Sequence, residues 1–126
     1  MAYIPCKIGG GTEKPTLLWT NPSPNSNFLP QTLSINLTDY EWILISIKNQ
    51  VVSPQYVTTC AIPKITDDQV IGCPSGQTGS NYAYSRIINM NNNGITFQIA
   101  RSNYSGYSGN DLVIPFKIYG LKKALI

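Results

Sequence analysis

The stretch WILISIK, residues 42–48, decides the fold class of this chain. Ile43, Ile45 and Ile47 occupy every second position, and the residues between them are of mixed polarity. A period of two places alternate side chains on opposite faces of a β-strand, whereas a helix needs a period of 3.6. The stretch therefore predicts a strand whose isoleucines face a core.

The same alternation recurs in three other stretches, where apolar residues again occupy every second position. These inward sets are Leu33, Ile35 and Leu37; Ile95, Phe97 and Ile99; and Leu112, Ile114, Phe116 and Ile118. Turn signals between the stretches divide the chain into short strands. We expect these strands at 16–20, 31–38, 42–49, 56–63, 70–71, 82–90, 95–101 and 112–121.

Seven or eight short strands and no amphipathic helix of normal length predict an all-β fold. We expect an antiparallel β-sandwich, jelly-roll-like or Greek key. Asn91-Asn92-Asn93-Gly94 predicts a hairpin turn, because Asn-Gly accepts the positive φ of primed turns. Pro115 predicts an edge position or a bulge in the last strand, because proline has no N–H for the ladder.

A chain of 126 residues has room for one domain. We expect the sandwich over 16–126 and an N-terminal arm over 1–15, with three consecutive glycines as a hinge. The apolar residues Tyr3, Ile4 and Pro5 predict that this arm attaches the domain to something else. The alternative is a terminus that stays disordered.

Charged residues make up 12% of the chain, and its net charge is +3. The charged fraction is about half of the usual one, which favours a surface that packs against other subunits. Basic residues are scattered, whereas a nucleic-acid surface clusters them, so we expect no nucleic-acid partner. We also expect no membrane insertion, because the longest apolar run is far too short. The N-terminus lacks the pattern of a signal peptide, which predicts folding in a cytoplasm.

Residue types argue against an enzyme. The chain has no histidine, which removes the usual general base and the Ser/His and Cys/His systems. Asp39 and Glu41 flank a tyrosine, and Asp67 and Asp68 are adjacent, but turn formation and solvation explain such acids as well as catalysis does. No loop has the ligand spacing of a metal site. We expect no enzymatic activity, no cofactor and no metal.

Three cysteines are a poor disulfide framework. Cys60 and Cys73 are far enough apart in sequence to pair. The interpretation that we favour is three buried or half-buried thiols, as is usual in a protein made in a cytoplasm.

Four apolar residues fall on the outer faces of their strands if the isoleucines face the core: Trp42, Leu44, Val113 and Tyr119. Exposed apolar groups often face a partner, so these residues are a candidate oligomer interface. The alternative is that another part of the same domain covers them.

The segment 102–111 is rich in glycine and serine and carries Tyr104, Tyr107, Asn110 and Asp111. Aromatic rings stack on ligands, and amide groups supply adaptable hydrogen bonds. These four residues are a candidate ligand-contact loop, with an ordinary connection as the alternative.

Three segments, in this order and spacing, resemble small β-sandwich modules of tailed-phage and prophage virion proteins. They are LLWTNPSP at 17–24, with Phe28 and QTL at 31–33 after it; LTDYE at 37–41; and IPFKIYGLK at 114–122. The resemblance covers about 16–122 and supplies no binding residues. It implies a non-enzymatic component of the virion surface, made in the bacterial host cytoplasm, usually as a homotrimer or another symmetric array.

The sequence thus predicts a phage structural protein of the tail-fibre, head-fibre or capsid-decorating type. We expect it to be attached to other virion proteins by its arm and to contact host-surface glycans through its loops. The short arm favours a head-fibre or capsid-decorating role over a fibre tip. The alternative is a carbohydrate-binding module of a bacterial surface or secreted protein.

Overall fold

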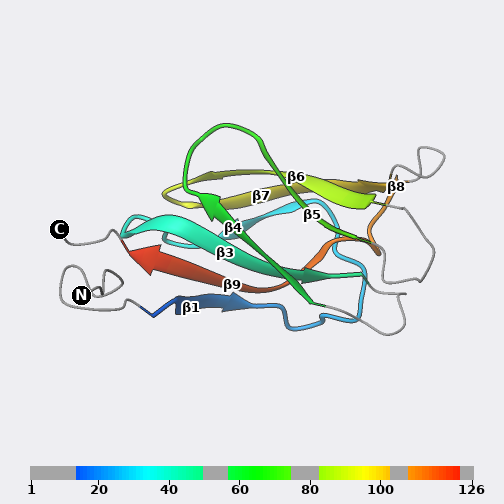
Figure 1. Cartoon of the computed structure of the whole chain (residues 1–126), viewed down its shortest axis with the longest axis horizontal. Coiled ribbons are helices and arrows are strands. Elements are labelled where there is room, and N and C mark those ends of the chain that lie inside the picture. The colour runs from blue at the N-terminus through cyan, green and yellow to red at the C-terminus, as the bar shows by residue number, and fades with distance from the viewer. Residues whose placement is uncertain (1–13, 50–56, 75–82, 103–107, 123–126) are drawn as a thin grey trace, which may run out of the picture.

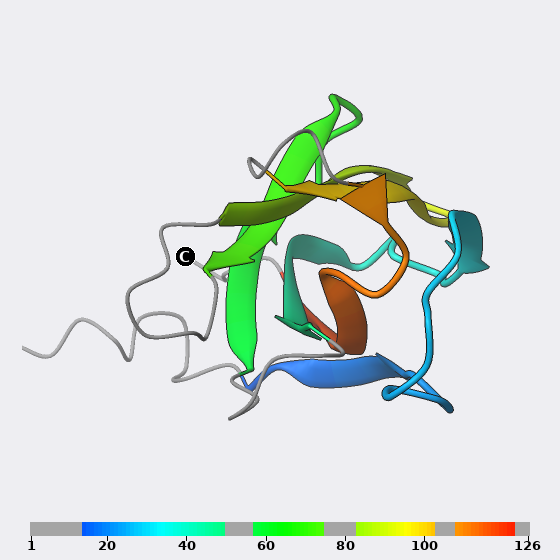
Figure 2. The ribbon, with the colours of Figure 1, turned by 90° about the vertical axis from the view of Figure 1, so that its right-hand side faces the viewer.

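The computed structural model describes residues 14–49, 57–74, 83–102 and 108–122. These residues form two antiparallel sheets that pack face to face, which confirms the predicted β-sandwich. In Figure 1, strands β6 and β7 lie above β3, β9 and β1, and the turned view of Figure 2 keeps the two layers apart.

The first sheet, sheet A, has the strand order β1-β9-β3-β4, and the second, sheet B, has the order β2-β7-β6-β5. Sheet A consists of β1 (Thr16–Thr20), β9 (Ile114–Lys122), β3 (Tyr40–Lys48) and β4 (Thr58–Pro63). Sheet B consists of β2 (Gln31–Ser34), β7 (Gly94–Ser102), β6 (Ala83–Asn91) and β5 (Gln69–Pro74), with a two-residue β8 (Ser108–Gly109) paired with β7. Strand β8 was not predicted, and the strand expected at 31–38 ends at Ser34.

The isoleucine side of β3 lies in the core, as predicted. Ile43, Ile45 and Ile47 are all 0% exposed. Full burial of such a side chain stabilises the fold by about 1.5–3 kcal/mol relative to exposure. An aromatic cluster continues the core, because Phe28 packs edge-to-face against Phe97 at 5.2 Å and against Trp19 at 6.2 Å between ring centroids.

Register shifts overturn the predicted alternation at two places. The ladder of β6 and β7 shifts between Arg86 and Ile88, so Ala100 is buried and Ile99 is only half-buried. In β9 the ladder to β3 shifts between the partners of Ser46 and Ile47, and Phe116 is half-buried there. Pro115 adjoins this shift in a central strand, so its predicted bulge is confirmed and its edge position is wrong.

The predicted hairpin joins β6 to β7, but its turn differs from the expectation. Asn91 pairs with Gly94, and the N–H of Asn93 donates to Asn91 Oδ1 at 2.7 Å. Among the described residues other than glycine, Val113 alone has a positive φ, so the asparagines do not form a primed turn. Glycine is required at 94 for another reason, because the carbonyl oxygen of Leu33 occupies the place of a Cβ.

Two side chains of the β4 segment tie sheet A to sheet B. Cys60 is a free thiol whose Sγ lies 3.6 Å from the carbonyl oxygen of Gly72 in β5, so it does not pair with Cys73. Lys64, which follows β4, reaches across to the β6–β7 turn and donates to Asn92 Oδ1 at 2.6 Å. Both ties close the sandwich along the side where β4 and β5 lie.

Candidate functional site

The outer side of sheet A carries a continuous set of apolar side chains, which we call the apolar face. Some of its members alternate along their strand with the buried isoleucines. The others lie directly opposite one of these outward-facing members on a neighbouring strand. They are Leu17, Trp42, Leu44, Ala61, Pro63, Tyr119 and Leu121. Because all four strands of the sheet contribute, the face spans the sheet from edge to edge.

Cross-strand pairing arranges the apolar face in two rows. Leu44 lies opposite Tyr119 on one side and Ala61 on the other, and Tyr119 in turn lies opposite Leu17. The second row has Trp42 at its centre, between Leu121 and Pro63. Directly opposed side chains in an antiparallel sheet are close enough to touch, so each row forms one surface.

This surface is exposed to solvent at some positions and half-buried at others. Trp42 is 45% exposed and Leu17 is 51% exposed, whereas Leu44 and Tyr119 are half-buried. The outward positions of Trp42, Leu44 and Tyr119 confirm their predicted place on the outer side of the sandwich. Whether they form an oligomer interface remains a prediction.

The prediction that Val113 faces outward is wrong. Its side chain is 0% exposed and belongs to the core. Its φ of 47° lies in the left-handed region, which a β-branched residue rarely adopts. The N–H of Val113 donates to Asn49 Oδ1 at 2.8 Å, and its carbonyl accepts from Arg86 at 3.1 Å. These two bonds turn the backbone before β9 and direct the side chain inward.

Arg86, which holds this turn, is itself buried at 1% exposure. Its guanidinium donates to the carbonyl oxygens of Gln98 at 2.7 Å, Leu112 at 2.8 Å and Val113 at 3.1 Å. It also lies 5.4 Å from the ring centroid of Phe28, within the range of a cation–π interaction. Desolvation lowers the pKa of Arg86 from its ordinary value to about 10, so it remains charged at neutral pH. Arg86 is therefore a structural cation.

The candidate ligand-contact loop lies only partly within the described residues. Tyr104 and Tyr107 lie outside them, while Asn110 and Asp111 are half-buried beside the core. The carbonyl of Asn110 accepts from the N–H of Phe28 at 2.8 Å, and its buried Oδ1 has no hydrogen bond. These contacts tie Asn110 to the fold and do not present it as a ligand group.

The attachment residues Tyr3, Ile4 and Pro5 also lie outside the described residues. Within the described ranges, no group of three His, Cys, Asp or Glu side chains gathers as a metal site would require. The same residues include no helix long and apolar enough to cross a membrane.

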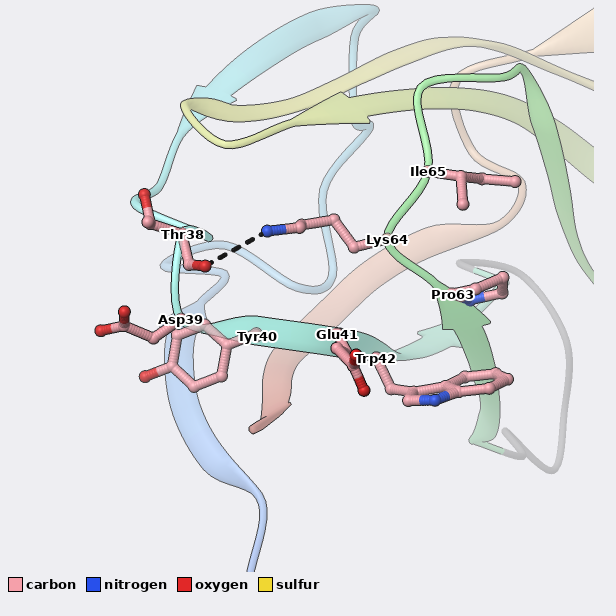
Figure 3. A pocket seen from close by; sticks show the side chains of 8 residues that line it. All are labelled: Thr38, Asp39, Tyr40, Glu41, Trp42, Pro63, Lys64 and Ile65. Carbon is pink, nitrogen blue, oxygen red and sulfur yellow. Dashed lines mark hydrogen bonds between the residues drawn. The ribbon is translucent and has the colours of Figure 1, made fainter. Parts of the chain in front are cut away.

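A pocket of about 430 Å³ adjoins the apolar face, and we call it the corner pocket. It lies where the chain turns into β3 and where β4 leaves the sheet (Figure 3). Its lining residues are Thr38, Asp39, Tyr40, Glu41, Trp42, Pro63, Lys64 and Ile65. Its two walls are 25 residues or so apart in the chain, and the ladder of β3 with β4 brings them together.

Hydrogen bonds fix one wall of the corner pocket. The backbone N–H of Lys64 donates to the carbonyl of Glu41 at 2.7 Å, which continues the ladder beyond Pro63. The Lys64 ammonium donates to the carbonyls of Leu37 at 2.8 Å and Thr38 at 3.4 Å and to Asn92 Oδ1. An ammonium has three protons to donate, so these bonds occupy all of them.

The sequence offered one signal for this pocket, the closely spaced Asp39, Glu41 and Trp42. It did not show that Lys64 would join them. No family model, no curated protein and no solved structure matches this chain. Its function is therefore argued from the apolar face, the corner pocket and the sequence resemblance.

Proposed function

We propose that this chain is a non-enzymatic structural protein of a bacteriophage virion that assembles with copies of itself through the apolar face. The observation that carries self-assembly is an apolar surface that spans all four strands of sheet A and includes the exposed Leu17 and the half-buried Leu44 and Tyr119. Contiguous exposed apolar patches on soluble domains mark interaction sites. The virion setting is supported by the resemblance of three sequence segments to phage modules.

A homotrimer is the arrangement that the resemblance implies. In such an assembly each copy turns its sheet A toward the axis, and Leu44 and Tyr119 meet their counterparts at the centre. Sheet B then faces outward. A central apolar core with a polar rim is the usual anatomy of a stable interface.

Light scattering coupled to size exclusion tests self-assembly. We expect a mass of three chains that persists on dilution into the micromolar range. A monomer at every concentration would remove the apolar face as the basis of the function. Leu44→Ala supplies a second check, because it should weaken association more than it lowers the melting temperature. An unchanged mass with a lower melting temperature would instead mean that Leu44 stabilises the single subunit and not the contact between copies.

The virion setting needs its own experiment. Labelled antibody against the chain should decorate purified phage particles in electron micrographs, at the head for a head fibre or decorating protein and at the tail for a tail fibre. A variant that lacks residues 1–15 should keep its oligomeric mass and no longer attach to particles. Absence of label from all particles would reject the virion setting and leave self-assembly standing.

A carbohydrate-binding module is the second candidate, and the corner pocket favours it. A half-exposed indole and two carboxylates at one pocket are suited to a sugar ring. A monomer that binds glycans would support this candidate over the assembly role.

A further inference from the structure

We propose that the corner pocket binds the ring of a neutral saccharide, with Trp42 as the stacking surface and Asp39 and Glu41 as acceptors for its hydroxyl groups. The proposal rests on the second candidate function, carbohydrate binding. It does not require self-assembly, but it requires that the exposed side of Trp42 stay outside any contact between copies. It also moves the expected glycan contact from segment 102–111 to the opposite end of the sandwich, beside the β6–β7 turn, to which Lys64 is bound.

The size and composition of the pocket suit one sugar unit. Its volume of about 430 Å³ falls in the range of roughly 300–1,000 Å³ that is typical of small-molecule sites. Such sites combine apolar lining with a few polar groups that fix the orientation of the ligand. Here Trp42, Pro63 and Ile65 supply the apolar part.

The indole of Trp42 is held in place from one side. Trp42 lies opposite Pro63 in the β3–β4 ladder, and Figure 3 shows the ring extending alongside this proline. With 45% of the residue exposed, the indole still offers a flat apolar surface to a ligand. The C–H face of a pyranose is flat and apolar in the same way, so the two surfaces can stack.

A bulge brings an acceptor to the indole. The β3–β9 ladder shifts between Tyr40 and Trp42, so Glu41 is the extra residue, and Figure 3 shows its carboxylate on the same side of the strand as Trp42. Among the residues that the structure describes, none donates a hydrogen bond to the carboxylate of Asp39 or of Glu41. Ionised carboxylates only accept hydrogen bonds, and they accept strongly. A ligand for this pocket must therefore bring donors.

Lys64 lies beside the two carboxylates. Its ammonium lines the same pocket, and its protons are occupied by Leu37, Thr38 and Asn92, so its positive charge is fixed there. That charge offsets part of the attraction that the two carboxylates exert on a cationic ligand, whereas the carboxylates still accept hydrogen bonds from a neutral polyol. A neutral sugar meets both the stacking surface and the acceptors, and it needs no charge to do so.

Nuclear magnetic resonance of the full chain tests the proposal, because the chain has two tryptophans. The probes are glucose, galactose, mannose and N-acetylglucosamine, as monomers and as short oligomers. We expect at least one of them to shift the indole N–H signal of Trp42 saturably. The signal of Trp19, which packs against Phe28 in the core, serves as the internal reference and should stay in place.

Matched variants assign the binding to the pocket. Glu41→Gln and Asp39→Asn should each weaken it by about fivefold or more, since each removes a charged acceptor. Asp67→Asn removes an exposed carboxylate outside the pocket and should change nothing. Saturable binding of choline or lysine in place of sugars, sugar binding that Glu41→Gln leaves intact, or no shift with any sugar would each overturn the proposal.

Self-association is measured on the same samples by light scattering. Glu41→Gln should leave the oligomeric mass unchanged, because Glu41 is not part of the apolar face. Tyr119→Lys should dissociate the oligomer and keep the sugar-induced shift. Loss of sugar binding and loss of assembly are thereby separate outcomes.

Discussion

The two sheets of this sandwich distribute polarity in opposite ways. Sheet A presents isoleucines to the core and an apolar face to the outside. Sheet B presents hydroxyl and amide groups to the outside, where Thr32 and Thr96 bond to each other at 2.9 Å, and it places the cation of Arg86 inside. Val70, at 63% exposure, is the main apolar residue on its outer side.

This difference leads us to expect a partner on sheet A and none on sheet B. The outer groups of sheet B form hydrogen bonds with each other and with water, so that side is satisfied in a lone subunit. The outer groups of sheet A gain only by leaving water, at about 25 cal/mol per Å² of apolar area. Substitutions at four positions test this contrast, two positions in the interior and two on the outer faces.

Replacement of the buried cation should have the largest effect. Arg86→Met leaves three carbonyls without their donor, two of them buried, and we expect it to lower the free energy of unfolding by about 4 kcal/mol. Chemical denaturation measures this loss. A variant as stable as the parent would mean that sheet B tolerates an apolar interior like that of sheet A.

The pH dependence of this loss follows from the pKa of Arg86, which burial lowers to about 10 in the fold and which is higher in the unfolded chain. Well below pH 10 the residue is protonated in both states, so it binds no proton on unfolding. The stability difference between the parent and Arg86→Met should therefore be constant from about pH 5 to about pH 8. Above about pH 10, and below the higher pKa of the unfolded chain, the unfolded chain holds the extra proton, so Arg86 makes stability rise with pH.

A charge at the centre of the apolar face should have the next largest effect. Leu44→Lys places an unpaired cation where copies of the chain meet, and we expect association to weaken by about 100-fold or more. Analytical ultracentrifugation measures the mass. The matched control on sheet B is Thr96→Lys, which should leave the mass as it is. If both variants lowered the mass equally, the outer faces of the two sheets would not differ in their role in association.

Truncation of the Val113 side chain tests whether this residue belongs to the core, as in the structure, or to the apolar face, as the sequence predicted. Val113→Ala should cost about 2 kcal/mol of stability, because it opens a cavity, and should leave association unchanged. Val113→Gly removes more side chain but relieves the positive φ, so it should destabilise no more than alanine does. Thermal melts measure the stability, and light scattering measures the oligomeric mass. If Val113→Ala dissociated the oligomer without lowering the melting temperature, Val113 would belong to the interface after all.

The smallest effect is expected on the outer side of sheet B. Thr96→Val breaks the bond to Thr32 but keeps the β-branched shape, so stability should change by less than about 0.5 kcal/mol. Circular dichroism melts are sufficient for this measurement. A larger loss would show that sheet B depends on its surface hydroxyls.

Periodicity alone was enough to predict the sandwich, its isoleucine core and the outward positions of Trp42, Leu44 and Tyr119. These features depend on the two-residue repeat of a single strand. The burial of Ala100 in place of Ile99, and of Val113, depends on bulges and on one positive φ, which the repeat does not encode.

The corner pocket could not be predicted from the sequence, for a different reason. Its walls come from the start of β3 and the end of β4, and only the register of those strands places Lys64 beside Glu41. Arg86 was missed as well, because an arginine in a strand is ordinarily expected on the solvent side. Its three acceptors belong to other segments of the chain, so no local sequence pattern predicts them.

Arg86 has a consequence for how the chain folds. Its acceptors lie 12, 26 and 27 residues away along the chain. The full set of these bonds replaces the water lost by the guanidinium only when β7 and the turn before β9 are both in place. A half-assembled sandwich therefore holds a dehydrated cation with too few partners, which makes partial intermediates unfavourable. One side chain thus pushes folding toward a single cooperative step, at the cost of a slow search for distant contacts.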